Sequence, residues 1–398
     1  MEIDFKKKLV ESLFGNIVRY ILNLVFPFIV ARLYTPELFG RYTYAISIIS
    51  ILIFLCTLGL DTGLLYFIPR NGKKYILSAF TINLLTSSAI ITILFFTTES
   101  WMHPFLPLIW FLSVENMFFS LYRTNQKIKE FFFISGFLNI SIKIALSAIL
   151  FLFFGAQLNN LVIATYAAVI FSTILYILQN RNMFEGFSIS KELVKYSVPL
   201  IIGGMVSVII QNTDLIMISN MIGETEVALY KVGTEISNFP SILLLVVNTV
   251  FPPIIASLYH QKKLDQLRGL YKKITRWLAF TSFIIISMLL FFREGILSLY
   301  GKEFLDAQNV LIYRGIGQMV NAAVGSVWYI IIMTGHPKMN MYGKFATCGI
   351  NVILNFILIP VMGIDGAAFA SMISTSFVNI LGYSIVKRIL KVKVFKYI

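Results

Sequence analysis

The stretch LNFILIPVMGIDGAAFASMIS, residues 354–374, has the pattern of a helical hairpin inside a membrane. Its first half is an apolar helix that Pro360 is expected to end, because proline has no N–H for a helix interior. Gly363 and Gly366 supply a turn, and the small residues that follow allow a second helix to pack closely. The stretch therefore predicts two membrane-spanning helices joined by a tight turn.

The remainder of the chain has the same apolar character. Hydrophobic residues make up 58% of the 398 residues and charged residues 13%, whereas a soluble domain usually has about a quarter charged residues. In lipid, backbone polar groups must be bonded within helices or a closed barrel, and the alternating pattern of barrel strands is absent from the sequence. We therefore expect an all-α, polytopic membrane protein.

Twelve apolar segments are long enough to cross the membrane, which takes roughly 20 helical residues for about 30 Å of hydrocarbon. The expected transmembrane helices are 12–31, 41–67, 76–97, 104–122, 131–154, 160–178, 196–220, 228–256, 274–292, 309–334, 343–361 and 365–386. The first segment follows a basic start but has no convincing cleavage site, so we interpret it as a retained helix rather than a signal peptide.

The basic residues indicate how the helices are oriented. The net charge is +14, and most of the 33 Lys and Arg residues lie at the N-terminus and in every second loop, within 6–8, 70–74, 123–129, 181–195, 262–276, 338–344 and 387–396. The positive-inside rule places these segments, with both termini, in the cytoplasm. Nucleic-acid binding is disfavoured because the charges form no patch with interleaved aromatic residues.

A short repeat indicates two lobes of the same orientation. LFGRYTYAIS at 38–47 is similar to VALYKVGTEIS at 227–237, and the shared tyrosine is Tyr42 in one copy and Tyr230 in the other. Each copy lies where the chain enters a helix from the expected outer face. We expect a six-helix lobe over 1–180, a cytoplasmic linker over 181–195 and a second six-helix lobe over 196–398, as in transporters built from parallel repeats.

Four longer segments resemble polysaccharide-transport members of the multidrug/oligosaccharidyl-lipid/polysaccharide exporter superfamily. They are the hairpin at 354–374, QNTDLIMISNMIGETEVALYKVGTEIS at 211–237, VFPPIIASLYHQKKLDQLRGLYKK at 250–273 and RLYTPELFGRYTYAIS at 32–47. No single motif is specific, but their order and spacing cover nearly the whole chain. At this length, the chain is similar to the O-antigen, capsule or exopolysaccharide repeat-unit flippases.

The resemblance implies a MATE-like V of two bundles around a cationic cavity, in the bacterial cytoplasmic (inner) membrane. The implied activity is translocation of undecaprenyl-diphosphate-linked oligosaccharides from the inner to the outer leaflet by alternating access. We expect no cofactor, and transport coupled to H⁺ or Na⁺ and uncoupled transport both stay open. The expected partners are the lipid-linked substrate, membrane lipid, a polysaccharide polymerase and other assembly proteins.

Three basic residues inside the expected helices are candidates for binding such an anionic substrate, namely Arg19, Lys143 and Arg314. Charge at membrane depth is costly and usually marks function. Arginine offers a planar fork for phosphate oxygens, and lysine acts as a point charge. For Arg19 the alternative is that its side chain reaches the cytoplasmic interface, about 10 Å away by helical rise.

Three acidic residues are candidates for coupling to H⁺ or Na⁺, namely Asp214, Glu235 and Glu115. Asp214 is expected to face Glu235 of the next helix, and the alternative role of Glu115 is an ion pair with Lys143. No zinc or catalytic cluster can be formed by spacing from His103, His260 and His336, and the two cysteines lie in apolar segments, where a disulfide is not expected.

Two other functions remain as alternatives at this stage. A MATE-type drug or cation antiporter would share the fold, but acidic residues should then dominate the membrane interior. A polysaccharide polymerase or ligase would need a large outer loop, and the longest outer loop, 293–308, has no room for a catalytic domain. We therefore expect a transporter and not an enzyme.

Overall fold

The computed structural model describes residues 21–188, 191–392 and 394. Within these ranges the chain is helical and contains no strand, which confirms the all-α fold. Two compact units are present, Met1–Asn212 and Thr213–Ile398, and their boundary lies inside helix α10, Ile201–Met221. The lobe limits expected from the sequence, with a linker over 181–195, stay a prediction.

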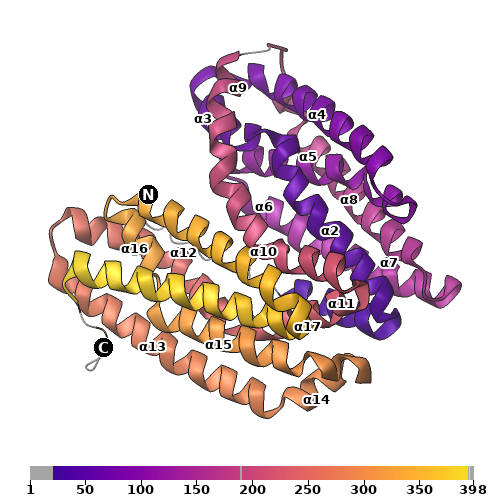
Figure 1. Cartoon of the computed structure of the whole chain (residues 1–398). Coiled ribbons are helices and arrows are strands. Elements are labelled where there is room, and N and C mark those ends of the chain that lie inside the picture. Colours follow the sequence, from indigo (N-terminus) through magenta and orange to yellow (C-terminus); the bar gives the residue numbers. More distant parts are fainter. Residues whose placement is uncertain (1–20, 189–190, 393, 395–398) are drawn as a thin grey trace. The chain divides into compact units, whose positions relative to one another are not determined.

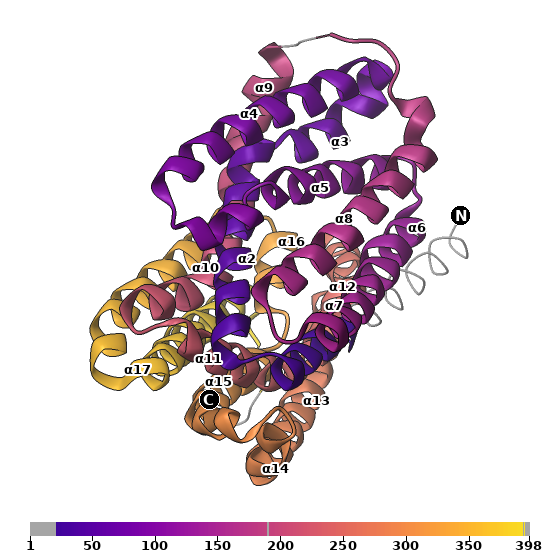
Figure 2. The ribbon, with the colours of Figure 1, turned by 90° about the vertical axis from the view of Figure 1, so that its right-hand side faces the viewer.

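The first unit contains one helix over Ile21–Leu33 and then α2 to α9, followed by the first part of α10. The bounds are α2 Pro36–Thr57, α3 Leu60–Asn71, α4 Ile76–Thr97, α5 Leu108–Thr124, α6 Ile128–Phe132, α7 Asn139–Phe154, α8 Leu158–Asn180 and α9 Lys191–Ser197. A π-helical turn, Phe133–Leu138, joins α6 to α7. Helix α5 packs against both α3 and α4 (Figure 2).

The second unit contains the rest of α10 and seven further helices. They are α11 Glu224–Ser237, α12 Phe239–His260, α13 Leu264–Phe291, α14 Arg293–Ser298, α15 Gln308–Val324, α16 Val327–Met333 and α17 Pro337–Leu390. Helix α15 packs against α11, α13 and α17 (Figure 1). It therefore lies at the centre of this unit.

Local sequence explains where α2 begins. Thr35 precedes the helix in an extended conformation, and its hydroxyl accepts a hydrogen bond of 3.4 Å from the Leu38 N–H. Pro36 occupies the first turn, where its missing N–H costs nothing, and Glu37 forms a 3.0 Å ion pair with Arg41 one turn later. The first copy of the repeated phrase thus sits in the opening turns of a capped helix.

Nine helices in the described part of the chain are long and apolar enough to cross a membrane, and the bent pair Lys302–Val324 and Val327–Met333 would make ten. One of the nine, Pro337–Leu390, contains two expected spans, because the chain breaks at Gly363, with φ 60° and ψ −138°. Residues 12–20 of the expected span 12–31 lie outside the described residues, and the rest of it falls in the helix Ile21–Leu33. The multi-pass helical fold is confirmed, and the count of twelve stays a prediction.

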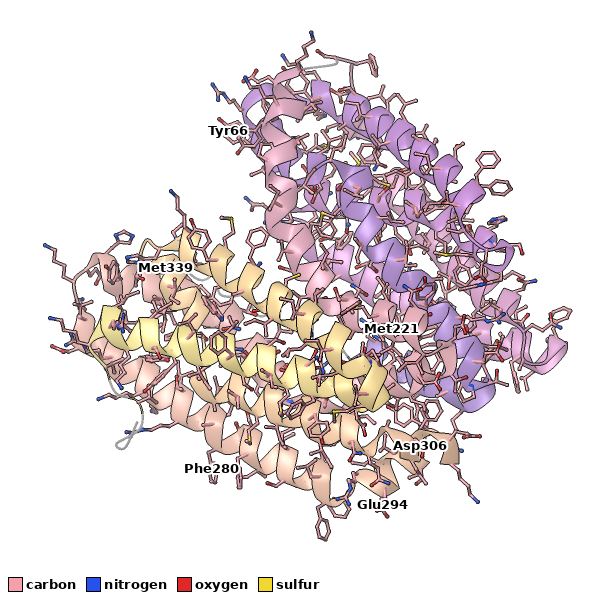
Figure 3. The ribbon with its side chains drawn as sticks, viewed as in Figure 1. Tyr66, Met221, Phe280, Glu294, Asp306 and Met339 are labelled. Atoms are coloured by element: carbon pink, nitrogen blue, oxygen red, sulfur yellow. The ribbon has the colours of Figure 1, made fainter. Side chains whose placement is uncertain are left out.

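The surfaces of these helices suit lipid. In α4 the side chains of Leu85, Ile93 and Phe96 are 62–81% exposed. Phe280 of α13 is 66% exposed and points away from the second unit (Figure 3). Exposed apolar surface on this scale would be costly in water and is satisfied by hydrocarbon. Each unit keeps its own interior apolar cluster, which includes Tyr122 and Tyr176 in the first and Phe251 and Tyr271 in the second.

The hairpin at 354–374 forms, but Pro360 does not end its first helix as expected. Pro360 lies near the end of the first arm, where only a few residues of helix follow it, and the chain turns at Gly363, whose positive φ favours glycine. Gly366 then allows the two arms to touch, because a Cβ at this position would lie 2.3 Å from the Leu358 carbonyl oxygen.

We predict that Gly366→Ala destabilises the second unit by about 1–3 kcal/mol, because the added methyl group meets backbone that cannot rotate away. The measurement is thermal unfolding of the purified protein in detergent. Gly349→Ala is the matched control, since Gly349 lies in the same helix and a Cβ there meets nothing within 4 Å. Equal unfolding temperatures for the two variants would contradict this explanation of the hairpin.

Candidate ion-coupling site

Asp214 is the centre of a buried polar cluster in the second unit. Its side chain is 4% exposed and lies on α10. One carboxylate oxygen, Oδ1, accepts hydrogen bonds from the amides of Asn351 at 3.0 Å and Asn355 at 2.7 Å. The other oxygen, Oδ2, accepts from the Ser371 hydroxyl at 2.5 Å and from the Tyr230 hydroxyl. Four donors from two helices, α11 and the two arms of α17, therefore hold this carboxylate in place.

Arg314 of α15 supplies a positive charge to the same cluster. Its Nη1 lies 3.7 Å from Asp214 Oδ2, and the arginine side chain is 18% exposed. Charge-assisted hydrogen bonds between nitrogen and oxygen are usually about 2.7–2.9 Å long, so this contact is an ion pair without a strong hydrogen bond. The Arg314 Nε is buried without a partner within the described structure. The guanidinium is thus only partly satisfied by Asp214.

Close packing of two helices brings these charges together. In α15, a Cβ at Gly317 would lie 3.2 Å from the Met372 Cα, so the glycine allows α15 to approach the second arm of α17. Arg314 lies one helical turn before Gly317, and Ser371 directly precedes Met372. The small residues of the hairpin therefore position the polar cluster as well as the helices.

The two asparagines support each other on the first arm of α17. Asn355 donates to the Asn351 Oδ1 at 3.2 Å, and Asn351 donates to the Ser371 Oγ at 3.0 Å. Their spacing of one helical turn places both amides on the same face. The Asn355 Oδ1 is buried and has no hydrogen-bond donor in the described structure. An unpaired oxygen next to a carboxylate is suited to a cation.

Among the described residues, the structure brings Asp214 and Arg314 of the expected site together. Glu235 does not face Asp214; it forms a 2.6 Å ion pair with Lys231 one turn earlier on α11. The residue of α11 that contacts Asp214 is Tyr230 and not Glu235. The expected roles of all these residues stay predictions.

The other expected site residues belong to the first unit. The Lys143 amino group lies 3.9 Å from the centre of the Phe26 ring, in a cation–π contact, and Lys143 itself is half-buried in α7. Glu115 is half-buried in α5, and its pairing with Lys143 stays a prediction. Arg19 lies outside the described residues.

Sequence reasoning missed four members of the cluster: Tyr230, Asn351, Asn355 and Ser371. Asn355 and Ser371 lie within the opening stretch, and the two asparagines stand one helical turn apart in an otherwise apolar helix. That spacing was a usable signal, because amides on the same face of a membrane helix need a shared partner. Tyr230 was noticed only as part of the repeated phrase.

The apolar helices that bury this carboxylate and arginine form a multi-pass helical fold, and solved membrane-protein structures share it. The lipid II flippase MurJ, in an inward closed conformation, matches with a TM-score of 0.79 and 13% identity over 95% of this chain and 87% of that one. A multidrug-resistance MATE family transporter of the MOP superfamily, facing inward, matches with a TM-score of 0.73 and 13% identity over 94% of each chain.

The sequence identifies the family. A sequence model described as "Polysaccharide biosynthesis protein" matches residues 29–309, so the chain belongs to this polysaccharide biosynthesis family. The capsular polysaccharide biosynthesis protein CapF of Staphylococcus aureus is 23% identical over 96% of this chain and 97% of its own length. This match confirms the resemblance to a polysaccharide family, and the fold is one that the solved flippase and transporter structures share.

We predict an unequal effect on stability when the two buried charges are removed. Asp214→Asn leaves Arg314 without its counter-charge and should cost about 3–5 kcal/mol, as for other buried pairs broken from one side. Arg314→Gln should cost less, because four donors still hold the carboxylate. The measurement is thermal unfolding of both single variants and of the double variant. The double variant should lose less stability than the two single variants lose in sum.

Lys231→Gln is the control for this double-mutant cycle. It removes an ion pair whose side chains are 29% and 20% exposed, and partly exposed pairs of this kind contribute at most about 1 kcal/mol. Strictly additive effects of Asp214→Asn and Arg314→Gln would show that the two groups do not interact.

Proposed function

We propose that this protein flips undecaprenyl-diphosphate-linked oligosaccharide repeat units from the inner to the outer leaflet of the bacterial cytoplasmic membrane. The observation that carries the proposal is an arginine in a membrane-spanning unit, Arg314, whose partner Asp214 engages it only loosely. An anionic diphosphate needs such a cation to cross hydrocarbon, because the free energy of moving an unpaired charge there is prohibitive. Membership of the polysaccharide biosynthesis family supports this choice of cargo.

We place both termini and the basic loops on the cytoplasmic side. The support is the charge distribution: the segment 262–276, which includes the start of α13, and the segment 387–396 are rich in Lys and Arg. Two of these arginines also hold the end of the chain against α13, since Arg268 donates to the Leu390 carbonyl at 2.6 Å and Arg276 to the Val394 carbonyl at 2.9 Å. The substrate would then enter from the side on which it is made.

Asp214 and Arg314 provide a way to couple transport to a cation. When H⁺ or Na⁺ binds to Asp214, the carboxylate no longer attracts Arg314. The guanidinium is then free to bind the diphosphate of the substrate through its planar fork of donors. When the cation leaves, Asp214 attracts Arg314 again and the diphosphate is released.

The residues around Asp214 suit a small cation. Hard cations prefer oxygen ligands, and the cluster contains the two carboxylate oxygens, the Ser371 hydroxyl and the buried Asn355 Oδ1. A proton needs only the carboxylate itself. Flipping in proteoliposomes distinguishes the two ions. It is measured once under a Na⁺ gradient at constant pH and once under a pH gradient without Na⁺.

We predict that Asp214→Asn strongly reduces coupled export. In a host whose own gene is deleted, wild-type protein should restore surface polysaccharide, whereas Asp214→Asn should leave lipid-linked repeat units in the inner leaflet. The loss of export should be about 5–150-fold, the usual range of coupling between two sites. Surface polysaccharide and extracted lipid-linked saccharide are measured together.

Glu235→Gln is the matched control, because it also neutralises a carboxylate of the second unit, but one paired with Lys231. It should restore export to near the wild-type level. If the deletion host has normal surface polysaccharide and altered drug sensitivity, the proposed function is wrong and the drug-antiporter alternative is favoured.

We predict a role in transport for the charge of Lys143 in the first unit. Lys143→Arg keeps the cation near the Phe26 ring and should retain most of the export, whereas Lys143→Met keeps the length of the side chain but should lose export. The readout is again surface polysaccharide in the deletion host, with the amount of protein in the membrane measured in parallel. Full export by Lys143→Met would remove Lys143 from the substrate path.

A further inference from the structure

The second unit contains a cavity of about 290 Å³, separate in its lining from the Asp214 cluster. It lies between α16 and both arms of α17. Its wall includes Trp328, Tyr329, Asn340, Lys344, Thr347 and Val378. Two aromatic rings, an amide, a hydroxyl and an ammonium group therefore line one space.

The Trp328 indole in this wall is held in a fixed position. Its Nε1–H donates to the Asn379 Oδ1 at 3.1 Å. A Cβ at Gly343 would lie 2.4 Å from the indole Cη2, and one at Gly382 would lie 3.1 Å from Cζ2. The two arms of α17 thus use glycines where the ring needs room, which indicates that the position of the ring is specified by the sequence.

This lining matches the chemistry of a sugar phosphate. The C–H bonds of a sugar ring pack against aromatic rings, whose faces carry partial negative charge. Its hydroxyl groups need donors and acceptors such as the Asn340 amide and the Thr347 hydroxyl. Lys344 adds a positive charge suited to an attached phosphate. The volume is near the lower end for small-molecule pockets, about 300 Å³, which suits a single sugar ring rather than an oligosaccharide.

We propose that this Trp328 pocket binds the sugar attached to the diphosphate of the lipid-linked substrate. The inference rests on the proposed function and deepens it. Lys338 and Lys344 belong to a basic segment that we place on the cytoplasmic side, so the pocket lies where the substrate enters. Along α17, Lys344 precedes Asn351 of the Asp214 cluster by two turns, about 10 Å at 1.5 Å per residue. One helix therefore links the sugar pocket to the ion site.

Fluorescence of Trp328 tests the proposal directly. The protein has four tryptophans, and replacing Trp101, Trp110 and Trp277 with Phe leaves Trp328 as the only indole emitter. Full-length protein in lipid nanodiscs is titrated with lipid-linked saccharide extracted from the deletion host. Parallel titrations use undecaprenyl diphosphate without sugar, and the oligosaccharide released from the same extract by mild acid.

We expect the intact lipid-linked saccharide to change Trp328 emission saturably, and the sugar-free diphosphate to bind at least about tenfold more weakly. Asn340→Ala should raise the apparent Kd of the intact substrate about five- to tenfold through the lost hydrogen bond. Gly343→Ala, which displaces the indole, should do the same, whereas Gly349→Ala in the same helix should not.

Two results would overturn the proposal while leaving the proposed function standing. One is binding of the extract, measured by thermal stabilisation, without any change in Trp328 emission. The other is an equal response to the sugar-free diphosphate, which would make the pocket a site for lipid phosphate alone. Failure of the proposed function is recognised separately, because the deletion host would then accumulate no lipid-linked saccharide.

Discussion

Burial of the Asp214 carboxylate is the constraint on which the second unit depends. An isolated carboxylate in a membrane-spanning unit would be very costly, so four helical segments bring donors or charge to it: Tyr230 from α11, Arg314 from α15, and both arms of α17. The turn at Gly363 returns the second arm to the first, which places Ser371 beside Asn351. Packing, hairpin geometry and the candidate coupling site are therefore consequences of the same contacts.

The two copies of the repeated phrase show how the units differ. In the first copy, Tyr42 is buried and its hydroxyl lies 3.1 Å from the Thr165 hydroxyl, a neutral partner. In the second copy, Tyr230 is buried and donates to the carboxylate of Asp214. The same tyrosine position thus serves neutral packing in one unit and an ionic cluster in the other. If the units arose by duplication, this tyrosine marks a position at which the two copies came to differ.

Much of the fold could be predicted from the sequence, because hydrophobic segment length and the glycine turn are local properties. The span over 76–97 agrees with α4, and the hairpin turn lies at Gly363. The site could be predicted only in part. The sequence marked Asp214 and Arg314 as costly charges, but it could not show that residues 137 and 141 positions away, Asn351 and Asn355, complete the cluster. The partner of Glu235 was missed, although Lys231 lies only one turn away on the same helix.

We propose that a cation at Asp214 releases Arg314 for the diphosphate. The most direct test is the Kd of the extracted lipid-linked saccharide for the purified protein, measured with and without a saturating concentration of the coupling cation. We predict that the cation tightens substrate binding about 5–150-fold, and that substrate tightens cation binding by the same factor, as linkage requires. Equal substrate affinity in the presence and absence of the cation would contradict the claim.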